Sequence, residues 1–463
     1  MGEREDKRKH ELDQAIRKEQ EKRRAIREKR RRQERRKKII VAISAILILS
    51  MISCIVISNI NNKKNEKNDK DNNIITTENI TSRQLVEEPA TPIEPQVVFE
   101  KKEVKLIAVG DDLVHTGVWK SFEQEDGSHD YTKLFAGIQS YIDDADIKVI
   151  NQETIFGGEG TELSSYPVFN SPEEIGDAIA KVGFNVVLHA TNHAFDMGES
   201  GMLNSINFWK TKHPEVTMLG LNETAEDKND IPLLEVNGIT FALLNYTYSH
   251  NWESLSSVAE EHLNTLCDYD PDSRMLDFNK INPQVLEDIK RAEDLADFTI
   301  VFPHWGTEYV FGTTEQQDNF SMMMVEAGAD LIVGGHPHVI EPVKWIETDN
   351  GNRALCYYSL GNFVSTQDSI GGILGGMAKL TIIQDENGTY IDEDSIQAIP
   401  LVTDYLYPGY TGGALINGTY VLGEYTEEQA AAHGLLPRFG IRVTRDELLR
   451  ISEEMFGEYL SLE

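Results

Sequence analysis

Five short apolar runs recur along the chain, and each ends in polar residues that can bind a metal or move a proton. Runs of this length, rich in Val, Ile and Leu, are typical of strands that are buried on both faces. Because groups just past the carboxyl ends of neighbouring strands meet in one crevice, we expect these polar side chains to converge. Collecting carboxylates, amides and imidazoles there costs desolvation and charge repulsion unless a cation is bound, so the pattern predicts a metal site at the edge of a sheet. The runs are Leu106–Asp111, Ile147–Glu153, Val186–His193, Thr299–His304 and Leu331–His338.

Helical patterns alternate with these runs. Ser171, Pro172 and Glu174 predict a helix start with a Ser cap and Pro at the first helical position, and Gly183 predicts the end of that helix. Strands that alternate with helices of this length predict an α/β fold. Further helical patterns cover 199–212, 283–295 and 314–327, and further strand patterns cover 239–245, 355–360 and 377–383.

An apolar segment near the N-terminus predicts a membrane anchor. Residues 39–58 form 20 consecutive positions without a charge, which is long enough for one transmembrane helix. The basic cluster at 30–38 directly precedes it and predicts a cytoplasmic N-terminus with the main domain outside the cell membrane. Met51–Cys54 loosely resembles a lipobox, so lipidation at Cys54 is the alternative to a single-pass anchor.

Composition divides the chain into five expected parts. Residues 1–38 form a charged cytoplasmic segment, residues 39–58 the transmembrane helix, and the polar, Pro-punctuated residues 59–97 a flexible linker. Residues 98–400 carry the alternating pattern of the main domain. The less periodic residues 401–463 form a C-terminal extension.

The charge balance excludes one class of partner. Residues 39–463 hold 26 Lys and Arg against 68 Asp and Glu, a net charge of −42, whereas a nucleic-acid partner requires a basic surface. Four late arginines form either a basic patch or a solvated helix face; they are Arg438, Arg442, Arg445 and Arg450. Cys267 and Cys356 do not make a disulfide framework, and the sequence leaves open whether they pair.

The residues that end the apolar runs suit a pair of divalent cations. His336 and His338 flank a Pro, and in an extended segment residues two apart point the same way, so they predict a metal clamp. A carboxylate bridge with nitrogen and amide-oxygen ligands suits two ions such as Zn, Mn or Fe. His193 is then a candidate general acid toward the leaving group. Asp196 and Glu308 are expected to orient histidines or to cap helices.

Some histidines have a structural interpretation beside the functional one. His304, taken alone, is more typical of a hydrogen-bonded structural histidine. His115 and His189 are expected to be structural, because the first lies past its motif and the second still belongs to its strand. The metal hypothesis therefore depends on the co-occurrence of the motifs, each directly after a strand.

At these residues the chain resembles the CapA family of poly-γ-glutamate capsule synthesis proteins, which are similar to calcineurin-like metallophosphoesterases. The resemblance implies a four-layer α/β/β/α metallophosphoesterase-like sandwich, preceded by the transmembrane helix, with His193 as the acid. The matching motifs are Val109–Asp111, Asn151–Glu153, Ala190–His193 with Asp196 and Gly198, His304–Glu308, Gly335–His338 and Ser359–Phe363. The metal ligands that it implies are Asp111, Glu153, Asn192, His304, His336 and His338.

Three departures from the metallophosphoesterase pattern bear on this site. The first motif continues from Asp111 as Asp-Leu and lacks the usual histidine, Glu153 stands in place of Asp, and Thr191 precedes Asn192 where a second Asn is usual. The missing histidine leaves one metal position with fewer ligands. Glu is chemically equivalent to Asp as a bridge, and Thr191 keeps a hydroxyl.

The sequence therefore predicts a membrane-anchored, CapA-like protein of cell-surface polymer synthesis or export. It would be a dinuclear metal-dependent hydrolase of a phosphoester or a γ-glutamyl amide. Its expected partners are the membrane, a membrane-bound polymer synthase and an anionic surface polymer. The alternative is a non-catalytic accessory subunit that binds polymer or synthase, in which replacing His193 would leave function intact. A nucleotide phosphoesterase is a third, weaker possibility.

Overall fold

The computed structural model describes residues 100–409 and 413–463. The expected cytoplasmic segment, transmembrane helix and linker lie outside these residues. Within them, no helix has both the length and the apolar composition needed to cross a membrane.

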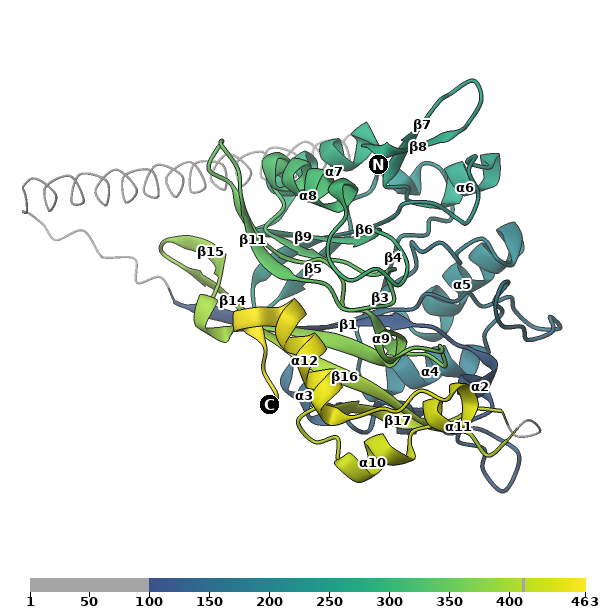
Figure 1. Cartoon of the computed structure of the whole chain (residues 1–463). Coiled ribbons are helices and arrows are strands. Elements are labelled where there is room, and N and C mark those ends of the chain that lie inside the picture. Colours follow the sequence, from purple (N-terminus) through teal and green to yellow (C-terminus); the bar gives the residue numbers. More distant parts are fainter. Residues whose placement is uncertain (1–99, 410–412) are drawn as a thin grey trace, which may run out of the picture. The chain divides into compact units, whose positions relative to one another are not determined.

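A nine-stranded mixed sheet forms one half of the described fold (Figure 1). Its parallel part is β1 to β4 in order, and its antiparallel part continues from β1 through β14 and β16 to β17. The short strand β13 pairs in parallel with the end of β1, and β15 pairs with β14. The bounds are β1 Lys102–Asp112, β2 Ile147–Asn151, β3 Val186–Leu188, β4 Thr217–Leu219, β13 Asn362–Val364, β14 Leu374–Asp385, β15 Gly388–Ile391, β16 Gln397–Leu406 and β17 Leu415–Val421.

A six-stranded sheet forms the other half. Four parallel strands lie at its centre in the order β12, β10, β9 and β6, and antiparallel β11 and β5 form its edges. The bounds are β5 Leu233–Val236, β6 Ile239–Thr247, β9 Phe298–His304, β10 Leu331–Val333, β11 Val343–Glu347 and β12 Arg353–Tyr357. A separate two-stranded ribbon consists of β7 Cys267–Tyr269 and β8 Leu276–Ile281. The five predicted apolar runs are thus divided between two sheets.

The two sheets pack against each other through a shared core. Phe241 and Leu243 of β6 belong to the same buried cluster as Leu106 of β1, whereas Ala242 and Leu244 belong to a second cluster with the neighbouring helices. This alternation follows from the two-residue period of a strand, because successive side chains point to opposite faces. Both faces of β6 are therefore covered by apolar side chains.

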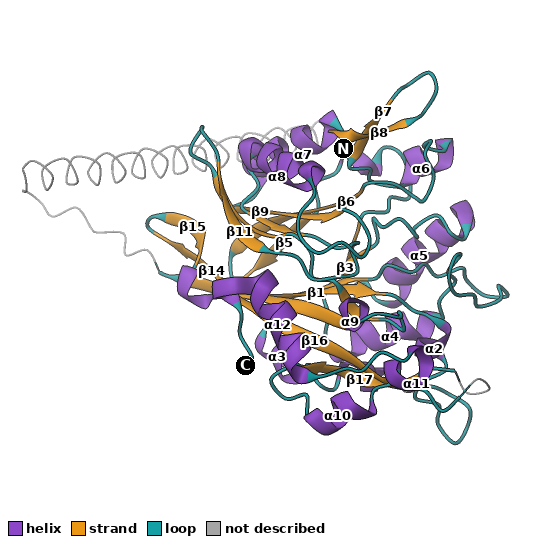
Figure 2. Cartoon of the chain, viewed as in Figure 1, coloured by secondary structure: helices purple, strands orange, loops and turns teal. Residues whose placement is uncertain are grey.

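Helices lie on the outer sides of the two sheets (Figure 2). On the six-stranded sheet these are α7 Pro283–Leu295 and α8 Glu315–Ala327, which contribute Val285, Ile289 and Met324 to the second cluster. On the nine-stranded sheet they are α3 Gln139–Asp144, α4 Glu173–Val182 and α5 Gly198–Lys212, all of which contribute to the first cluster. The helix α12 Arg445–Phe456 contributes to the same cluster, and its Phe456 lies against Gly376 of β14 on the side that faces Ile340. The order is therefore helices, sheet, sheet and helices. Shorter helices are α2 Thr116–Trp119, α6 Ser257–His262, α9 Ile370–Ile373, α10 Glu427–Ala432 and α11 Leu435–Phe439.

The mixed α/β prediction is confirmed, and the start of α4 is corrected. Pro172 occupies the N-cap position of α4 without a side-chain cap, and the expected cap Ser171 donates instead to Thr154 Oγ1 at 2.7 Å. Gly183 ends α4 as expected, with a left-handed φ of 109° that favours glycine. The boundary expected at residue 400 falls inside β16, and β17 continues the same sheet.

Candidate metal centre

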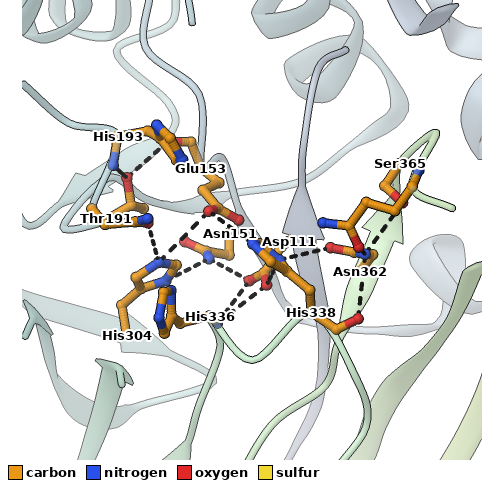
Figure 3. A network of polar contacts seen from close by, with 12 residues as sticks. Asp111, Asn151, Glu153, Thr191, His193, His304, His336, His338, Asn362 and Ser365 are labelled. Carbon is orange, nitrogen blue, oxygen red and sulfur yellow. Dashed lines mark hydrogen bonds and ion pairs between the residues drawn. The ribbon is translucent and has the colours of Figure 1, made fainter. Parts of the chain in front are cut away.

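The residues that end the predicted runs come together between the two sheets (Figure 3). Asp111 lies at the end of β1 and Glu153 follows β2 by two residues, while His304 ends β9 and His336 follows β10 of the other sheet. The sequence predicted a site at the edge of one sheet. The observed site instead lies where parallel strands of two packed sheets end together.

Asp111 is fixed by close backbone packing. Its N–H donates to the carbonyl of Gly361 at 2.8 Å, and a Cβ on Gly110 would lie only 1.9 Å from that same oxygen. Asn151 Nδ2 donates to Asp111 Oδ1 at 2.7 Å, and the N–H of His336 donates to Asp111 Oδ2 at 3.1 Å. The Asp111 carboxylate is therefore held in one orientation inside the protein.

Glu153 lies at the centre of the site. Its Oε1 is 3.8 Å from His304 Nε2 and 3.7 Å from His338 Nε2, and both of its buried oxygens are without a hydrogen-bond partner. Burial raises the pKa of Glu153 well above its usual range, and Asp111 raises it further while His338 opposes this. A buried carboxylate in this position requires either a proton or a cation.

Two groups of potential ligands share Glu153. One combines it with His304 and His336, and the other combines it with Asp111 and His338; within each group the ligand atoms lie within 4.8 Å of one another. A third group joins His336 and His338 to the exposed Glu308. The geometry thus places Glu153 where a carboxylate bridge between two cations would lie.

His336 and His338 converge for a different reason than the sequence suggested. Both have left-handed backbone conformations, with φ of 96° and 57°, so the segment around Pro337 is not an extended strand. Their ring centroids are 5.9 Å apart. Non-glycine residues with positive φ are strained, and such strain is concentrated at functional sites. The two imidazoles meet because the chain turns sharply at each of them.

Asn362 is a site residue whose role the sequence did not show. Its Oδ1 lies 3.0 Å from His338 Nδ1, while its Nδ2 donates to Gln367 Oε1 at 2.9 Å and to the carbonyl of Gly372 at 2.8 Å. The Nδ1 of His338 also lies 3.2 Å from Asp111 Oδ2, which leaves Nε2 directed toward Glu153. Asn362 was visible only as part of the Ser359–Phe363 motif, because its position depends on the parallel pairing of β13 with β1.

His193 is oriented by a carboxylate. Its Nδ1 lies 2.7 Å from Asp196 Oδ2, and that oxygen also accepts the N–H of Phe169 at 2.7 Å. The Phe169 ring packs edge-on against the His193 ring, with centroids 4.7 Å apart. With Nδ1 occupied, Nε2 is the atom of His193 available to a substrate.

Asn192 connects His193 to the metal-type ligands. Its Oδ1 lies 2.8 Å from His304 Nε2, and its Nδ2 donates to Asn251 Oδ1 at 3.1 Å. Asn251 has a left-handed φ of 68°, and its Nδ2 lies 3.4 Å from His193 Nδ1. Asn251 was not predicted, because it lies in a loop after β6 and carries no sequence signal of its own.

The imidazoles of the site differ in their protonation. Burial lowers the pKa of His304 and of His336 well below the usual range, so both are neutral and able to ligate at neutral pH. Burial also lowers the pKa of His338, but Glu153 and Asp111 outweigh it and raise the pKa to about 9. Negative charge on Glu153 and Asp111 thus favours the protonated form of His338 when no cation is bound.

His115, His189 and Asp112 lie outside the ligand groups. His189 Nε2 accepts the indole N–H of Trp209 at 2.8 Å, and burial lowers the pKa of His189 to about 3, as suits a structural histidine. Burial likewise lowers the pKa of His115 to about 3. Asp112 is buried without a partner, and burial raises its pKa to about 7.

Two questions that the sequence left open concern the late arginines and the cysteines. Arg450 forms ion pairs with Glu447 and Glu454, Arg445 donates to the carbonyl of Leu422, and Arg438 donates to that of Thr366, so these three arginines have separate partners. Cys267 and Cys356 are both buried and free.

The donor set fits a pair of divalent cations. It offers two carboxylates, three buried imidazoles and an amide oxygen, and the orphaned oxygens of Glu153 have no other partner. The fold and the site thus define a mixed α/β protein with a metal-type centre between two sheets. Residues 105–367, more than half of the chain, match the profile of the family described as bacterial capsule synthesis protein PGA_cap, and the chain belongs to this family.

Two curated relatives carry the same assignment. The chain is 32% identical over 203 residues to the capsule biosynthesis protein CapA of Bacillus anthracis, covering 43% of this chain and 44% of that protein. It is 33% identical over 186 residues to the PGA biosynthesis protein CapA of Bacillus subtilis, covering 40% of this chain and 44% of that protein. The matched regions thus span less than half the length of each relative.

Among solved structures, similar chains are a phosphatase from Mycoplasma pneumoniae and a hypothetical protein from Thermus thermophilus. The first has a TM-score of 0.37 at 15% identity, with 65% of this chain and 95% of that chain covered. The second has a TM-score of 0.37 at 14% identity, with 64% and 99% covered.

Proposed function

We propose that this protein is a dinuclear metal-dependent hydrolase that serves the synthesis or export of a capsular or other cell-surface polymer. The observation that carries the proposal is the buried carboxylate of Glu153, which has no hydrogen-bond partner and is shared by two ligand groups. Membership of the capsule synthesis family supports the biological role. The polymer is poly-γ-glutamate in this proposal, supported by the name of the Bacillus subtilis relative.

The residues divide between two cation positions. Asp111 and His338 would hold one cation together with Glu153, and Asn192, His304 and His336 would hold the other with the same carboxylate. When bound, such a pair supplies Lewis-acid polarisation of the substrate and lowers the pKa of bound water.

The remaining residues would handle the proton and the water. His193 would donate a proton from Nε2 to the leaving group, because the contact between its Nδ1 and Asp196 fixes the orientation of the ring. Phe169 packs against the His193 ring and would shield that side of it from water. The reaction would be hydrolysis of a phosphoester or of a γ-glutamyl amide, since a two-cation site suits both.

The proposal also includes the location of the protein. Residues 39–58 would form a single membrane span with the N-terminus in the cytoplasm, and the hydrolase domain would work outside the membrane beside a membrane-bound polymer synthase. The support is the uncharged segment and the basic cluster directly before it.

Metal content of the full-length chain, measured by plasma mass spectrometry after reconstitution with Zn, Mn or Fe, tests the site. We expect close to two ions per chain, and a clear loss of metal in His338→Ala. His193→Ala is the matched variant: it should keep its metal but lose hydrolysis of phosphoester or γ-glutamyl substrates. A chain that binds no metal would refute the mechanism, and polymer synthesis that survives His193→Ala would favour a non-catalytic accessory subunit.

A further inference from the structure

Arg438 is a half-buried cation with free hydrogen-bond donors. Its Nη1 donates to the carbonyl of Thr366 at 2.8 Å. Within residues 100–409 and 413–463, this is the one hydrogen bond that the guanidinium makes, and its Nε and Nη2 are not buried. One edge of the guanidinium therefore faces solvent and is able to donate two further hydrogen bonds.

The lack of a carboxylate partner distinguishes Arg438 from most arginines of the described residues. Four others each form an ion pair with Asp or Glu; they are Arg274, Arg291, Arg353 and Arg450. Residues 100–463 contain 61 acidic and 21 basic side chains, so carboxylates are abundant, yet none of the described ones lies within ion-pair distance of Arg438. A guanidinium edge binds a carboxylate through two parallel hydrogen bonds, so the free edge suits an anion from outside the chain.

The segment that Arg438 contacts leads directly to the metal-type ligands. Thr366 is followed by Gln367, whose Oε1 accepts from Asn362 Nδ2 at 2.9 Å. Asn362 Oδ1 lies 3.0 Å from His338 Nδ1. Arg438 is therefore connected to His338 through one peptide unit and the side chains of Gln367 and Asn362.

His115 connects the same segment to the candidate general acid. The N–H of Thr366 donates to His115 Nδ1 at 3.4 Å. The His115 ring packs edge-on against Phe169 with centroids 5.4 Å apart, and Phe169 in turn packs against His193. Burial lowers the pKa of His115 to about 3, and the charges of Arg438 and His193 are close enough to lower it further. Arg438 and His193 thus lie around the same histidine.

The guanidinium of Arg438 is oriented by its own surroundings. It lies 4.6 Å from the ring centroid of Phe439 and 5.8 Å from that of Tyr407. The helix α11, which carries Arg438, is fixed at its start because the N–H of Gly434 donates to the carbonyl of Tyr405 at 2.7 Å. These contacts hold the guanidinium in place before a ligand binds, which lowers the entropic cost of binding.

Exposed acids near the site would repel an anionic substrate. Glu308 lies within ligand distance of His338. Burial raises the pKa of Tyr309, and the nearby charges of Glu308 and Asp368 raise it further. A carboxylate that enters beside these acids needs a positive partner. The metal ions would hold the reacting group, so a further cation is required for the group next to it.

We propose that Arg438 binds a carboxylate of the substrate next to the hydrolysed bond. This inference rests on the proposed hydrolase function and assigns the residue that recognises the anionic polymer. Each unit of poly-γ-glutamate keeps its α-carboxylate free, because the polymer bond uses the γ-carboxyl group. A polymer held at the metal ions would therefore present carboxylates on either side of the reacting bond, and Arg438 would select for one of them.

Two pairs of matched substrates test this on the whole chain reconstituted with Zn. The first pair is a γ-glutamate pentamer and the same pentamer with carboxamides in place of its α-carboxylates; water adds to a γ-carbonyl carbon, the C–N bond breaks and the amine leaves. The second pair is a 4-nitrophenyl phosphodiester whose other ester is 4-carboxyphenyl or 4-carbamoylphenyl; water adds to phosphorus and 4-nitrophenolate leaves. In the pair that is hydrolysed, we expect kcat/KM to be about tenfold higher for the carboxylate member.

Variants assign the preference to Arg438. In Arg438→Gln the ratio should fall to about one, because kcat/KM falls for the carboxylate member and is unchanged for the carboxamide member. Arg438→Lys keeps the charge but loses the paired hydrogen bonds, so its ratio should lie between those two values. Arg442→Gln is the matched control: it removes the same charge from an exposed position on the same segment and should keep the wild-type ratio. Urea unfolding should show that all variants fold.

The outcomes separate this inference from the proposed function. Equal kcat/KM for both members in wild type would overturn the carboxylate site and keep the hydrolase. A preference that survives in Arg438→Gln, or that is also lost in Arg442→Gln, would overturn the assignment to Arg438. If neither pair is hydrolysed, the hydrolase proposal fails, and calorimetry with the two pentamers then decides the site. Tighter binding of the carboxylate pentamer that is lost in Arg438→Gln supports it, and equal affinity refutes it.

Discussion

Glu341, three residues after His338, is a buried carboxyl group, and its replacement by Gln tests how its burial makes the stability of the fold depend on pH. The side chain is 1% exposed; its Oε2 accepts from Gln317 Nε2 at 2.6 Å, and its Oε1 has no hydrogen-bond partner. Burial raises the pKa of Glu341 to about 8, although the bond from Gln317 opposes this. Gln317 also packs against Gly306, two residues after His304.

The size of the effect follows from the two pKa values. The ordinary value is 4.5 and the folded value is about 8. At about 1.4 kcal/mol per pH unit, this interval corresponds to about 5 kcal/mol of unfolding free energy. Because the folded pKa is the higher one, this stability is fully present below pH 4.5 and is lost as the pH rises through about 8. Glu341→Gln has no proton to lose and should not show the decline.

The unfolding free energies of wild type and Glu341→Gln are measured in urea at pH 5 and pH 9, in the presence of a chelator. The new amide of Gln also lacks a partner and costs about 1–3 kcal/mol, but it does so at every pH. The informative quantity is therefore the change with pH, which should be smaller in Glu341→Gln by up to about 5 kcal/mol. Glu424→Gln, at an exposed position, is the control. Parallel pH profiles for wild type and Glu341→Gln would refute the reasoning.

Three further predictions concern the site and its support. Asn362→Ala should lower the Zn affinity about 10- to 100-fold by calorimetry, because His338 Nδ1 loses its partner at 3.0 Å, while Asn362→Asp keeps an acceptor there. Gly110→Ala should lower the unfolding free energy by about 3 kcal/mol or more, because its Cβ would lie 1.9 Å from the Gly361 carbonyl oxygen. Zn at about 100 times its dissociation constant should raise the unfolding free energy of wild type by about 2.7 kcal/mol, measured in urea, and should raise it less in Glu153→Ala.

Specific results would contradict each of these predictions. Equal Zn affinity in wild type and Asn362→Ala would show that Asn362 does not fix the imidazole. Wild-type stability in Gly110→Ala would show that β1 and β13 are not in close contact. Equal stabilisation of wild type and Glu153→Ala by Zn would place the metal elsewhere.

The sequence was most informative where a strand leads directly into a polar residue. Apolar runs mark the strands that precede Asp111, Glu153, His304 and the two histidines after β10. Parallel strands bring their ends together, so these residues could be predicted to converge. The helical pattern over 314–327 was likewise visible, and α8 covers Glu315–Ala327. Such features depend on residues that are close together in the sequence, so they can be predicted from it.

The rest of the site depends on long-range contacts. Asn362 meets His338 because β13 pairs with β1, and Asn251 meets His193 because a loop from the other sheet folds over it. The left-handed turns at His336 and His338 are also set by tertiary packing, and neither residue type demands them. Neither the periodicity nor the spacing of residues in the sequence predicts these contacts.

The division of the ligands between two sheets has a consequence for how the protein matures. Asp111 and His338, which touch each other in the folded site, are 227 positions apart in the chain. A nascent chain that has been synthesised only as far as β3 and the loop after it contains the two acids and Asn192. It contains none of the three ligand histidines, which come later in the sequence. Closing so large a loop is slow relative to forming local structure, so the centre is completed only when both halves dock. Capture of a metal ion would then signal that the chain has finished folding, and a probe for bound metal would count mature molecules alone.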